Sequence, residues 1–233
     1  EMSASLVGSE MCIRDSPINN PMLWDEFNPN IYEAAATLEM EGMTDSKCET
    51  FGMRKLTNQN ALLQINNRRL FLRGTLECCI FPLKGYPPMD EAGWEKVFSA
   101  ARDYGMNHLR FHSWCPPEAA FNVADRMGFY IQVELPLWTL NVGEDKGTVD
   151  FLYNEAAHIM KEYGNHPSFC FWSLGNELQG DFSVMDKLLT TIKQQDSRHL
   201  YMTTTFTFEP GHGSWPEPND DFWVTPVSYT HLT

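Results

Sequence analysis

Polar side chains that can transfer protons or bind a polar ligand stand at the ends of several apolar stretches in this sequence. Carboxyl and imidazole groups are the side chains that most often move protons in enzymes. The residues in question are Glu77, His112, Glu134 and the pair Asn176-Glu177. Where these stretches end side by side, the sequence predicts a polar site.

The stretches that carry these residues read as strands, and they alternate with amphipathic segments of helical length. The expected strands cover 70–77, 107–113, 129–135, 169–177 and 199–208, and the expected helices cover 90–105, 116–128, 148–164 and 182–196. Asp90 can cap the first helix, while Gly105 and Gly128 follow the first two helices as stop signals.

Strictly alternating strands and helices indicate a parallel sheet. A doubly wound sheet and a (β/α)₈ TIM barrel both satisfy this order. No GxGxxG follows the first strand, which disfavours a dinucleotide-binding sheet. All five expected strands end in polar or aromatic groups, Thr205 being the one near the fifth. Because barrel enzymes build their sites at the carboxyl ends of the strands, we favour the barrel.

Composition excludes several classes of protein. The 233 residues include 17 Lys and Arg against 31 Asp and Glu, a net charge of −14, which is opposite to that of a nucleic-acid binder. No run of 18 apolar residues is present to span a membrane. Aromatic residues make up 13% and suit either a sugar site or a large core. The cysteines lack a CxxC spacing, so no zinc site is expected, and Cys79 and Cys170 are interpreted as buried free thiols.

The two ends do not read as native protein. Back-translating Ser5–Ser16 yields a sequencing adapter that ends in a transposon mosaic end, and Pro226–Leu232 yields the reverse complement of that end. We therefore interpret residues 1–16 and 226–233 as adapter-derived tails. Any signal peptide would then be lost, so the sequence leaves the compartment open, a periplasmic or secreted location included.

Between these tails we expect two domains. Residues 17–56 are interrupted by the turn-forming residues Pro, Asn and Gly, which predicts short strands and turns, typical of the end of a β-sandwich. Residues 57–225 hold the alternating pattern and form the N-terminal part of the barrel, with about strands one to five. The fifth strand is expected to leave an unpaired edge.

The segment Asn165–Glu177, NHPSFCFWSLGNE, resembles the NHPS…WSxGNE motif of glycoside hydrolase family 2, which includes β-galactosidases, β-glucuronidases and β-mannosidases. Other segments resemble the family in the same order. They are LWDEFNPNIYEA for the last strand of an immunoglobulin-like domain, FGMRKL and NNRRLFLRG for the barrel entry, and GMNHLRFHS…FNVADRMGFYIQVELP for the second and third barrel strands. The resemblance implies a TIM-barrel catalytic domain.

The resemblance also implies a reaction. Retaining glycosidases use two carboxyl groups about 5–5.5 Å apart, one as acid and base and the other as nucleophile. The family's acid/base maps onto Glu177, and Asn176 is then expected to bond the sugar 2-hydroxyl. The family's nucleophile ends the seventh strand, beyond this piece, which is therefore expected to be inactive alone. Glu209 follows strand five and lines the pocket or belongs to a loop.

The segments that shape the sugar pocket depart from the family pattern. Arg110-Phe-His112-Ser-Trp114 replaces Arg-x-x-His-Tyr, and Gly-Thr-Leu-Glu77 replaces a His-containing segment, so the sugar is left open. Arg110 either pairs with Glu134 or contacts substrate. Two roles stay open for Trp114 and Trp215, stacking on sugar or packing within loops. The predicted substrate-binding residues are Asn176, Arg110, His112, Glu134, Trp114, Trp138 and Glu77, and Trp138 and Trp172 are expected to wall Glu177.

We therefore expect an internal piece of a retaining exo-glycosidase acting on a β-glycoside, with a carbohydrate as its binding partner. No cofactor and no metal are expected, because the Mg²⁺ ligands of some relatives have no visible counterpart. The alternatives are a noncatalytic carbohydrate-binding relative and another retaining (β/α)₈ glycosidase, such as an endo-acting one. The oligomeric state is left open.

Overall fold

A parallel five-stranded sheet forms the centre of the computed structural model, which describes residues 17–60, 62–205, 211, 213 and 217–224. Its strand order is β10-β9-β8-β7-β6, so each strand lies beside the next one in sequence. The strands are β6 (Gly74–Glu77), β7 (His108–Phe111), β8 (Tyr130–Glu134), β9 (Phe169–Ser173) and β10 (Leu200–Met202). This order and direction confirm the predicted partial barrel over the reversing order of a doubly wound sheet.

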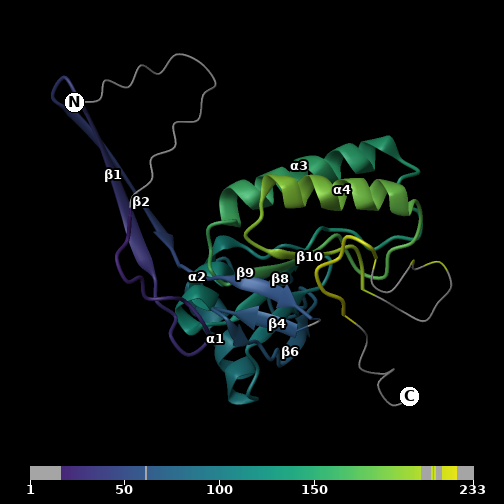
Figure 1. Cartoon of the computed structure of the whole chain (residues 1–233), viewed down its shortest axis with the longest axis horizontal. Coiled ribbons are helices and arrows are strands. Elements are labelled where there is room, and N and C mark those ends of the chain that lie inside the picture. Colours follow the sequence, from purple (N-terminus) through teal and green to yellow (C-terminus); the bar gives the residue numbers. More distant parts are fainter. Residues whose placement is uncertain (1–16, 61, 206–210, 212, 214–216, 225–233) are drawn as a thin grey trace.

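Four helices share one core with the same face of this sheet, and in Figure 1 one pair lies above the sheet and the other pair below it. They are α1 (Glu91–Asp103), α2 (Glu118–Met127), α3 (Lys146–Tyr163) and α4 (Phe182–Gln195). The predicted end signals are present. Asp90 accepts the N–H of Gly93 at the start of α1, and Gly128 ends α2 with a φ of 71°. Asp145 and Asp181 cap α3 and α4 in the same manner.

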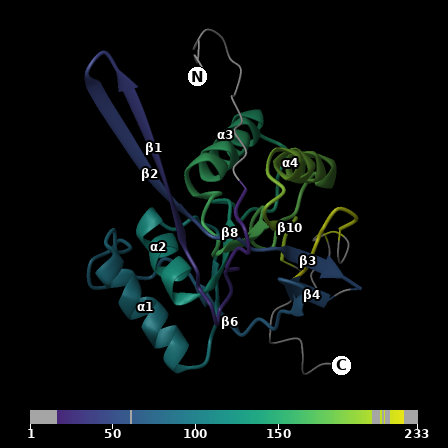
Figure 2. The ribbon, with the colours of Figure 1, turned by 60° about the vertical axis from the view of Figure 1, so that its left-hand side comes forward.

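Strand alternation divides the apolar residues between two cores. On the helix side, Leu109, Phe111, Ile131 and Val133 pack against the four helices. On the inner side, residues from β8, β9 and β10 pack with Trp24 and with a small antiparallel sheet. That sheet comprises β3 (Leu56–Gln59), β4 (Leu62–Ile65) and β5 (Arg68–Arg69), and it lies away from the helices in Figure 2.

An antiparallel hairpin, β1 (Tyr32–Met40) and β2 (Met43–Phe51), precedes the barrel segment. Each strand has nine residues, so these strands are longer than the sequence indicated. The hairpin projects away from the sheet and is mostly exposed (Figures 1 and 2). The segment before it is fastened to the barrel, because Trp24 is fully buried and its indole N–H donates to the carbonyl of Asp125.

Several details differ from the sequence expectations. The first barrel strand begins at Gly74 rather than Leu70, and the fifth ends at Met202, with residues 206–208 outside the described part. Cys170 is buried, as predicted, but Cys79 is exposed because it lies in the loop after β6. No helix among the described residues is long and apolar enough to cross a membrane.

As expected, no strand of the described residues pairs with the outer edge of β10, but two aspartates bind polar groups of this edge. The N–H of Asp221 donates to the carbonyl of Tyr201, and the Asp221 carboxylate accepts the N–H of Tyr201 at 2.9 Å. Asp220 similarly accepts the N–H and the hydroxyl of Thr203. Carboxylate oxygens therefore occupy the places that strand carbonyls would take, which satisfies donors of this edge.

Candidate functional site

The carboxyl ends of β7, β8 and β9 meet in a buried polar network. Arg110 Nε donates to Glu134 Oε1 at 2.6 Å, and Arg110 Nη2 donates to Asn176 Oδ1 at 2.5 Å. Glu134 is fully buried and the Arg110 side chain is only 11% exposed. One guanidinium thus joins a carboxylate at the end of one strand to an amide beyond the end of another. Of the two roles considered for Arg110, the structure contains the ion pair with Glu134.

The second oxygen of Glu134 is also engaged. Ser113, two residues after β7, donates its N–H to Glu134 Oε2 at 2.7 Å. To do so Ser113 adopts a φ of 60°, a conformation that is uncommon for a residue with a Cβ. Both oxygens of Glu134 are therefore bonded within the protein, one by the guanidinium of Arg110 and one by the backbone.

Asn176 is oriented by two donors. Its Oδ1 accepts from Arg110 and from the hydroxyl of Thr205, the latter at 3.1 Å. Because arginine only donates, this atom must be the oxygen, and the amide nitrogen keeps its two N–H groups for other partners. The orientation suits an Asn that donates to a hydroxyl of a bound ligand.

Glu177 follows directly and is held through its backbone. Its N–H donates to Thr205 Oγ1 at 2.9 Å, and its φ of 49° also lies in the left-handed region. The residue is half-buried. Within the described part of the chain, no hydrogen bond to the Glu177 carboxylate is found, whereas Glu134 is fully engaged. Of these two carboxylates, Glu177 is the one that remains available to act on a ligand.

Backbone hydrogen bonds join the loop that carries Glu177 to the loop after β8. The N–H of Asn176 donates to the carbonyl of Leu137, and Val142 exchanges backbone hydrogen bonds with Gln179 and Asp181. Gly175 permits the first contact, since a Cβ there would lie 2.3 Å from the Leu137 oxygen. The glycine of the WSLGNE segment is thus required by close approach of two backbones.

A ring pair lies beside this network. His112 and Trp138 are in edge-to-face contact, with ring centroids 5.0 Å apart, and come from the segments after β7 and β8. Trp138 is 62% exposed, so most of the indole is open to a ligand. His112 Nδ1 lies 3.1 Å from the hydroxyl of Ser113, whose N–H binds Glu134. His112 therefore lies beside the polar network and Trp138 beside His112, and their substrate-binding roles stay predictions.

Other predicted residues take different positions. Glu77 pairs across the sheet with Phe111, which belongs to the helix-side core, and its Oε2 accepts the N–H of Cys79. Burial raises the pKa of Glu77. Trp114 packs against Trp94 and Phe111 and donates its indole N–H to the carbonyl of Glu77. Among the hydrogen bonds and ring contacts of the described residues, none joins either side chain to Arg110, Glu134 or Asn176, and their substrate-binding roles stay predictions.

Trp172 does not wall Glu177, contrary to expectation. It is fully buried and pairs in register with Val133 and Tyr201, and all three belong to the helix-side core. Its neighbour Ser173 faces the inner side, where it is paired with Glu134. The alternation of the strand therefore places this indole on the opposite face from the site.

The first half of the NHPS…GNE segment lies at the other end of β9. His166 Nδ1 is 2.7 Å from Asp125 Oδ2, and the N–H of Ser168 donates to Asp125 Oδ1 at 2.9 Å. Pro167 accepts at its carbonyl from Arg54 Nε at 2.6 Å. These contacts fasten β9 to α2 and to the segment after β2, so this half of the motif is structural.

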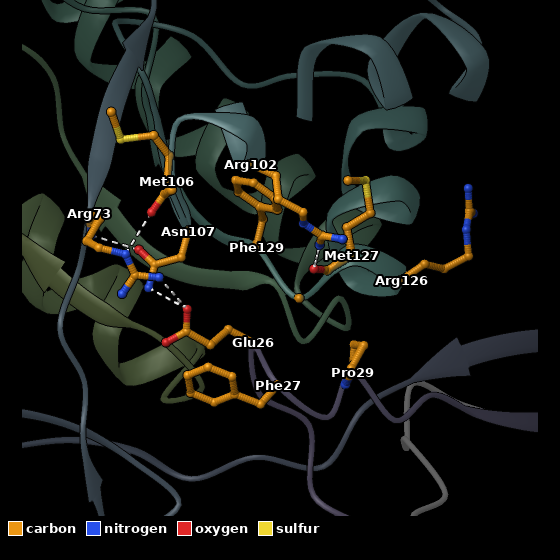
Figure 3. A pocket seen from close by; sticks show the side chains of 12 residues that line it. Glu26, Phe27, Pro29, Arg73, Arg102, Met106, Asn107, Arg126, Met127 and Phe129 are labelled. Atoms are coloured by element: carbon orange, nitrogen blue, oxygen red, sulfur yellow. Dashed lines mark hydrogen bonds and ion pairs between the residues drawn. The ribbon is translucent and has the colours of Figure 1, made fainter. Parts of the chain in front are cut away.

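A pocket of about 340 Å³ also opens at this far end, lined by Arg73, Arg102 and Arg126 (Figure 3). Each guanidinium already has a partner. Arg73 binds Glu26, Arg102 donates to the Met127 carbonyl, and Arg126 pairs with two glutamates of α1. The pocket is thus explained by contacts that close the ends of α1 and α2, away from the strand ends that carry Glu177.

Two features of the site were missed in the sequence. The backbone N–H of Ser113 and the hydroxyl of Thr204, which accepts the N–H of Leu178 at 2.7 Å, have no motif of their own. The run of three threonines after Met202 is the one sequence signal that could have indicated the role of the Thr204 hydroxyl.

Glu209 and Trp215 lie outside the described residues, as do residues 1–16 and 226–233. Among the residues that are described, no cluster of three or more His, Cys, Asp and Glu side chains is placed to bind a metal.

Two family models match the chain. Residues 56–205 match "Glycosyl hydrolases family 2, TIM barrel domain", and residues 3–54 match "Glycosyl hydrolases family 2". The second match begins within the stretch interpreted as adapter-derived, and the domain boundaries stay a prediction. Over 189 residues the chain is 26% identical to Beta-galactosidase 2 of Enterobacter cloacae, which covers 77% of this chain and 18% of that protein.

Two further relatives are similar. A putative beta-glucuronidase of Formosa agariphila is 29% identical over 163 residues, which cover 69% of this chain and 20% of that protein. The fold matches the crystal structure of a Parabacteroides merdae beta-glucuronidase with a TM-score of 0.78 and 22% identity, over 90% of this chain and 27% of that one. The chain thus spans about a fifth of the curated relatives it matches.

Proposed function

Since the chain belongs to glycosyl hydrolase family 2, we propose that the protein containing it is a retaining exo-glycosidase that hydrolyses the O-glycosidic bond of a β-glycoside. The observation that carries the proposal is the contrast between the two carboxylates at the strand ends. Glu134 is buried and bonded at both oxygens, whereas Glu177, half-buried, has its backbone fixed and its carboxylate available. A fixed backbone with an available carboxyl group suits a general acid/base.

In the proposed reaction Glu177 gives its proton to the glycosidic oxygen as the bond to the anomeric carbon breaks. A second carboxylate, outside the described residues, attacks that carbon and forms a glycosyl-enzyme. Glu177 then takes a proton from water, whose oxygen attacks the anomeric carbon and releases the sugar and the nucleophile. Each proton that leaves Glu177 in the first step is thereby restored in the second.

The neighbouring residues suit the binding of a sugar. The amide N–H groups of Asn176 are directed to a ligand because its oxygen is taken by Arg110 and Thr205. The exposed face of Trp138 offers an apolar surface of the kind that sugar rings pack against, and His112 supports that indole from one edge. We assign Asn176, His112 and Trp138 to substrate binding and Arg110 and Glu134 to the orientation of Asn176.

The test is Glu177→Gln in the full-length protein. Cleavage of an unactivated disaccharide should fall about 10²–10⁴-fold, because that is the usual contribution of general acid/base catalysis. An activated aryl glycoside should still form the glycosyl-enzyme, since its leaving group needs little proton donation. Added azide should then restore turnover by attacking the anomeric carbon without a general base, and the product should be the β-glycosyl azide.

The control is Glu144→Gln, which changes an exposed carboxylate in the loop after β8 and should leave both activities unchanged. Wild-type activity of Glu177→Gln on the disaccharide would exclude Glu177 as the acid/base. A wild-type protein that binds sugars and hydrolyses none would identify the noncatalytic alternative. Release of sugar from the interior of a polymer would identify an endo-acting enzyme instead.

A further inference from the structure

Two adjacent threonine hydroxyls bind the backbone of the loop that carries Glu177. Thr205 Oγ1 accepts the N–H of Glu177 at 2.9 Å, and Thr204 Oγ1 accepts the N–H of Leu178 at 2.7 Å. Both threonines follow β10, the neighbour of β9 in the sheet, and both are buried. Two successive peptide groups of one loop are thus bonded by side chains from the end of the next strand.

The conformation of Glu177 requires such support. Its φ of 49° lies in the left-handed region, which a residue with a Cβ visits rarely and keeps only when its surroundings hold it there. The preceding Gly175 and Asn176 are fixed by contacts to Leu137, but those contacts end before Glu177. Of the hydrogen bonds that the structure describes, the one to Thr205 is the one made by the peptide N–H of Glu177.

The Thr205 hydroxyl makes two hydrogen bonds, one as acceptor and one as donor. It accepts from the N–H of Glu177 and donates to Asn176 Oδ1 at 3.1 Å, the atom that also accepts from Arg110. A hydroxyl can accept and donate together, whereas a methyl group of the same size can do neither. Thr205 therefore ties the position of Glu177 to the orientation of Asn176.

We infer that Thr205 is a positioning residue for Glu177, which it keeps in the left-handed conformation that aims the carboxyl group at the glycosidic oxygen, with Thr204 supporting the next peptide. The inference rests on the proposed role of Glu177. Its consequence is specific, because a displaced acid impairs proton donation while leaving the rest of the site in place. A displacement of about 1 Å in a catalytic group is enough for a loss of about 10²-fold.

The experiment compares three variants of the full-length protein. Thr205→Val keeps the shape and removes the hydroxyl, Thr205→Ser keeps the hydroxyl, and Thr203→Val makes the same replacement where the hydroxyl bonds Asp220 instead. For each, kcat/KM is measured on an activated aryl glycoside and on an unactivated alkyl glycoside, across pH. Crystal structures of the variants report the φ of residue 177.

Thr205→Val should lose about 10–100-fold on the unactivated glycoside and less than about 3-fold on the activated one. The alkaline limb of its pH profile should move, and the φ of Glu177 should leave the left-handed region. Thr205→Ser should stay within about 3-fold of wild type on both substrates, as should Thr203→Val.

Equal losses of Thr205→Val on both substrates would overturn the inference, and so would an unchanged φ at residue 177 or a failure of Thr205→Ser to restore the activity. These outcomes are separate from a failure of the proposed function. If Glu177→Gln kept full activity on the disaccharide, Glu177 would not be the acid/base, while the φ of residue 177 in Thr205→Val would still report whether the hydroxyl holds the loop.

Discussion

Replacing Arg110 with methionine is expected to destabilise the barrel far more than the loss of a surface ion pair would. Methionine keeps much of the volume of the side chain and removes its charge and all its donors. Glu134 would keep only the N–H of Ser113, and Asn176 would lose the shorter of the two bonds to its oxygen. The fully buried carboxylate would then have no counter-ion within the network.

The magnitude follows from burial. Removing one partner of a buried ion pair costs about 3–5 kcal/mol, because the remaining charge stays away from water. Glu134 is fully buried and the Arg110 side chain is 11% exposed, so this regime applies. The matched control is Arg126→Met, whose partners Glu91 and Glu95 and whose own side chain are all exposed by 44% or more. There the cost should be about 0–1 kcal/mol.

The assay is hydrogen–deuterium exchange of the full-length protein, read on peptides that cover β7 and β8, since it reports the local free energy of opening in one part of a larger protein. Arg110→Met should lower the protection of these peptides by about 3–5 kcal/mol. The double variant Arg110→Met with Glu134→Gln should recover part of that loss, because an amide at position 134 carries no charge and still accepts from Ser113.

Two results would refute the reasoning. If Arg110→Met cost no more than Arg126→Met, the network would not be the dry, charged cluster that the distances describe. If the double variant were as unstable as the sum of the two single variants, Arg110 and Glu134 would not interact.

Two further predictions concern the opposite end of β9 and the approach to β10. Asp125→Ala should destabilise the protein by about 2–4 kcal/mol, measured by hydrogen–deuterium exchange, because His166 and Ser168 lose a buried acceptor. The kcat per active site, with the sites counted by active-site titration, should stay unchanged. Burial alone would raise the pKa of Asp196, but hydrogen bonds from His199 and Arg198 outweigh it and hold that pKa well below 3.8. The stabilisation by the Asp196 carboxylate is therefore complete above the ordinary aspartate pKa and is lost as the pH falls below it. Asp196→Asn should thus lower the urea midpoint of unfolding at pH 7, and the difference from the wild-type midpoint should shrink below about pH 4.

The sequence predicted the order and direction of the barrel strands well, because each element carries its own local signals. The helix ends at Asp90 and Gly128 and the apolar period of α1 and α2 are properties of short segments. It predicted strand ends poorly. Leu70 is apolar and buried, as a strand residue would be, yet it packs against Trp24 and Tyr130 before β6 begins.

The site was predicted in its charged members and missed in its backbone. A pair of Arg110 with Glu134 was one of the two roles that the sequence left open for Arg110, and opposite charges at neighbouring strand ends attract. The N–H of Ser113 that binds Glu134 and the hydroxyl of Thr204 that binds the N–H of Leu178 depend on left-handed turns and on the register of adjacent strand ends, which no local pattern encodes. Trp172 shows the same limit, since one step of strand alternation decides which face a side chain occupies.

The segment Asn165–Glu177 is long because its residues make specific contacts both before the start and beyond the end of β9. At the first end, His166 and Ser168 bind Asp125 and fix where β9 begins. At the other, Gly175 lets the backbone pass beneath Leu137, and Asn176 and Glu177 reach the hydroxyl of Thr205. Five residues of strand connect the two ends, so a shift of register at the first would move Glu177 by about 3.3 Å per residue and onto the wrong face. As long as the register of β9 is kept, loss of the contacts at its first end should therefore cost stability and leave the proposed chemistry at the other end in place.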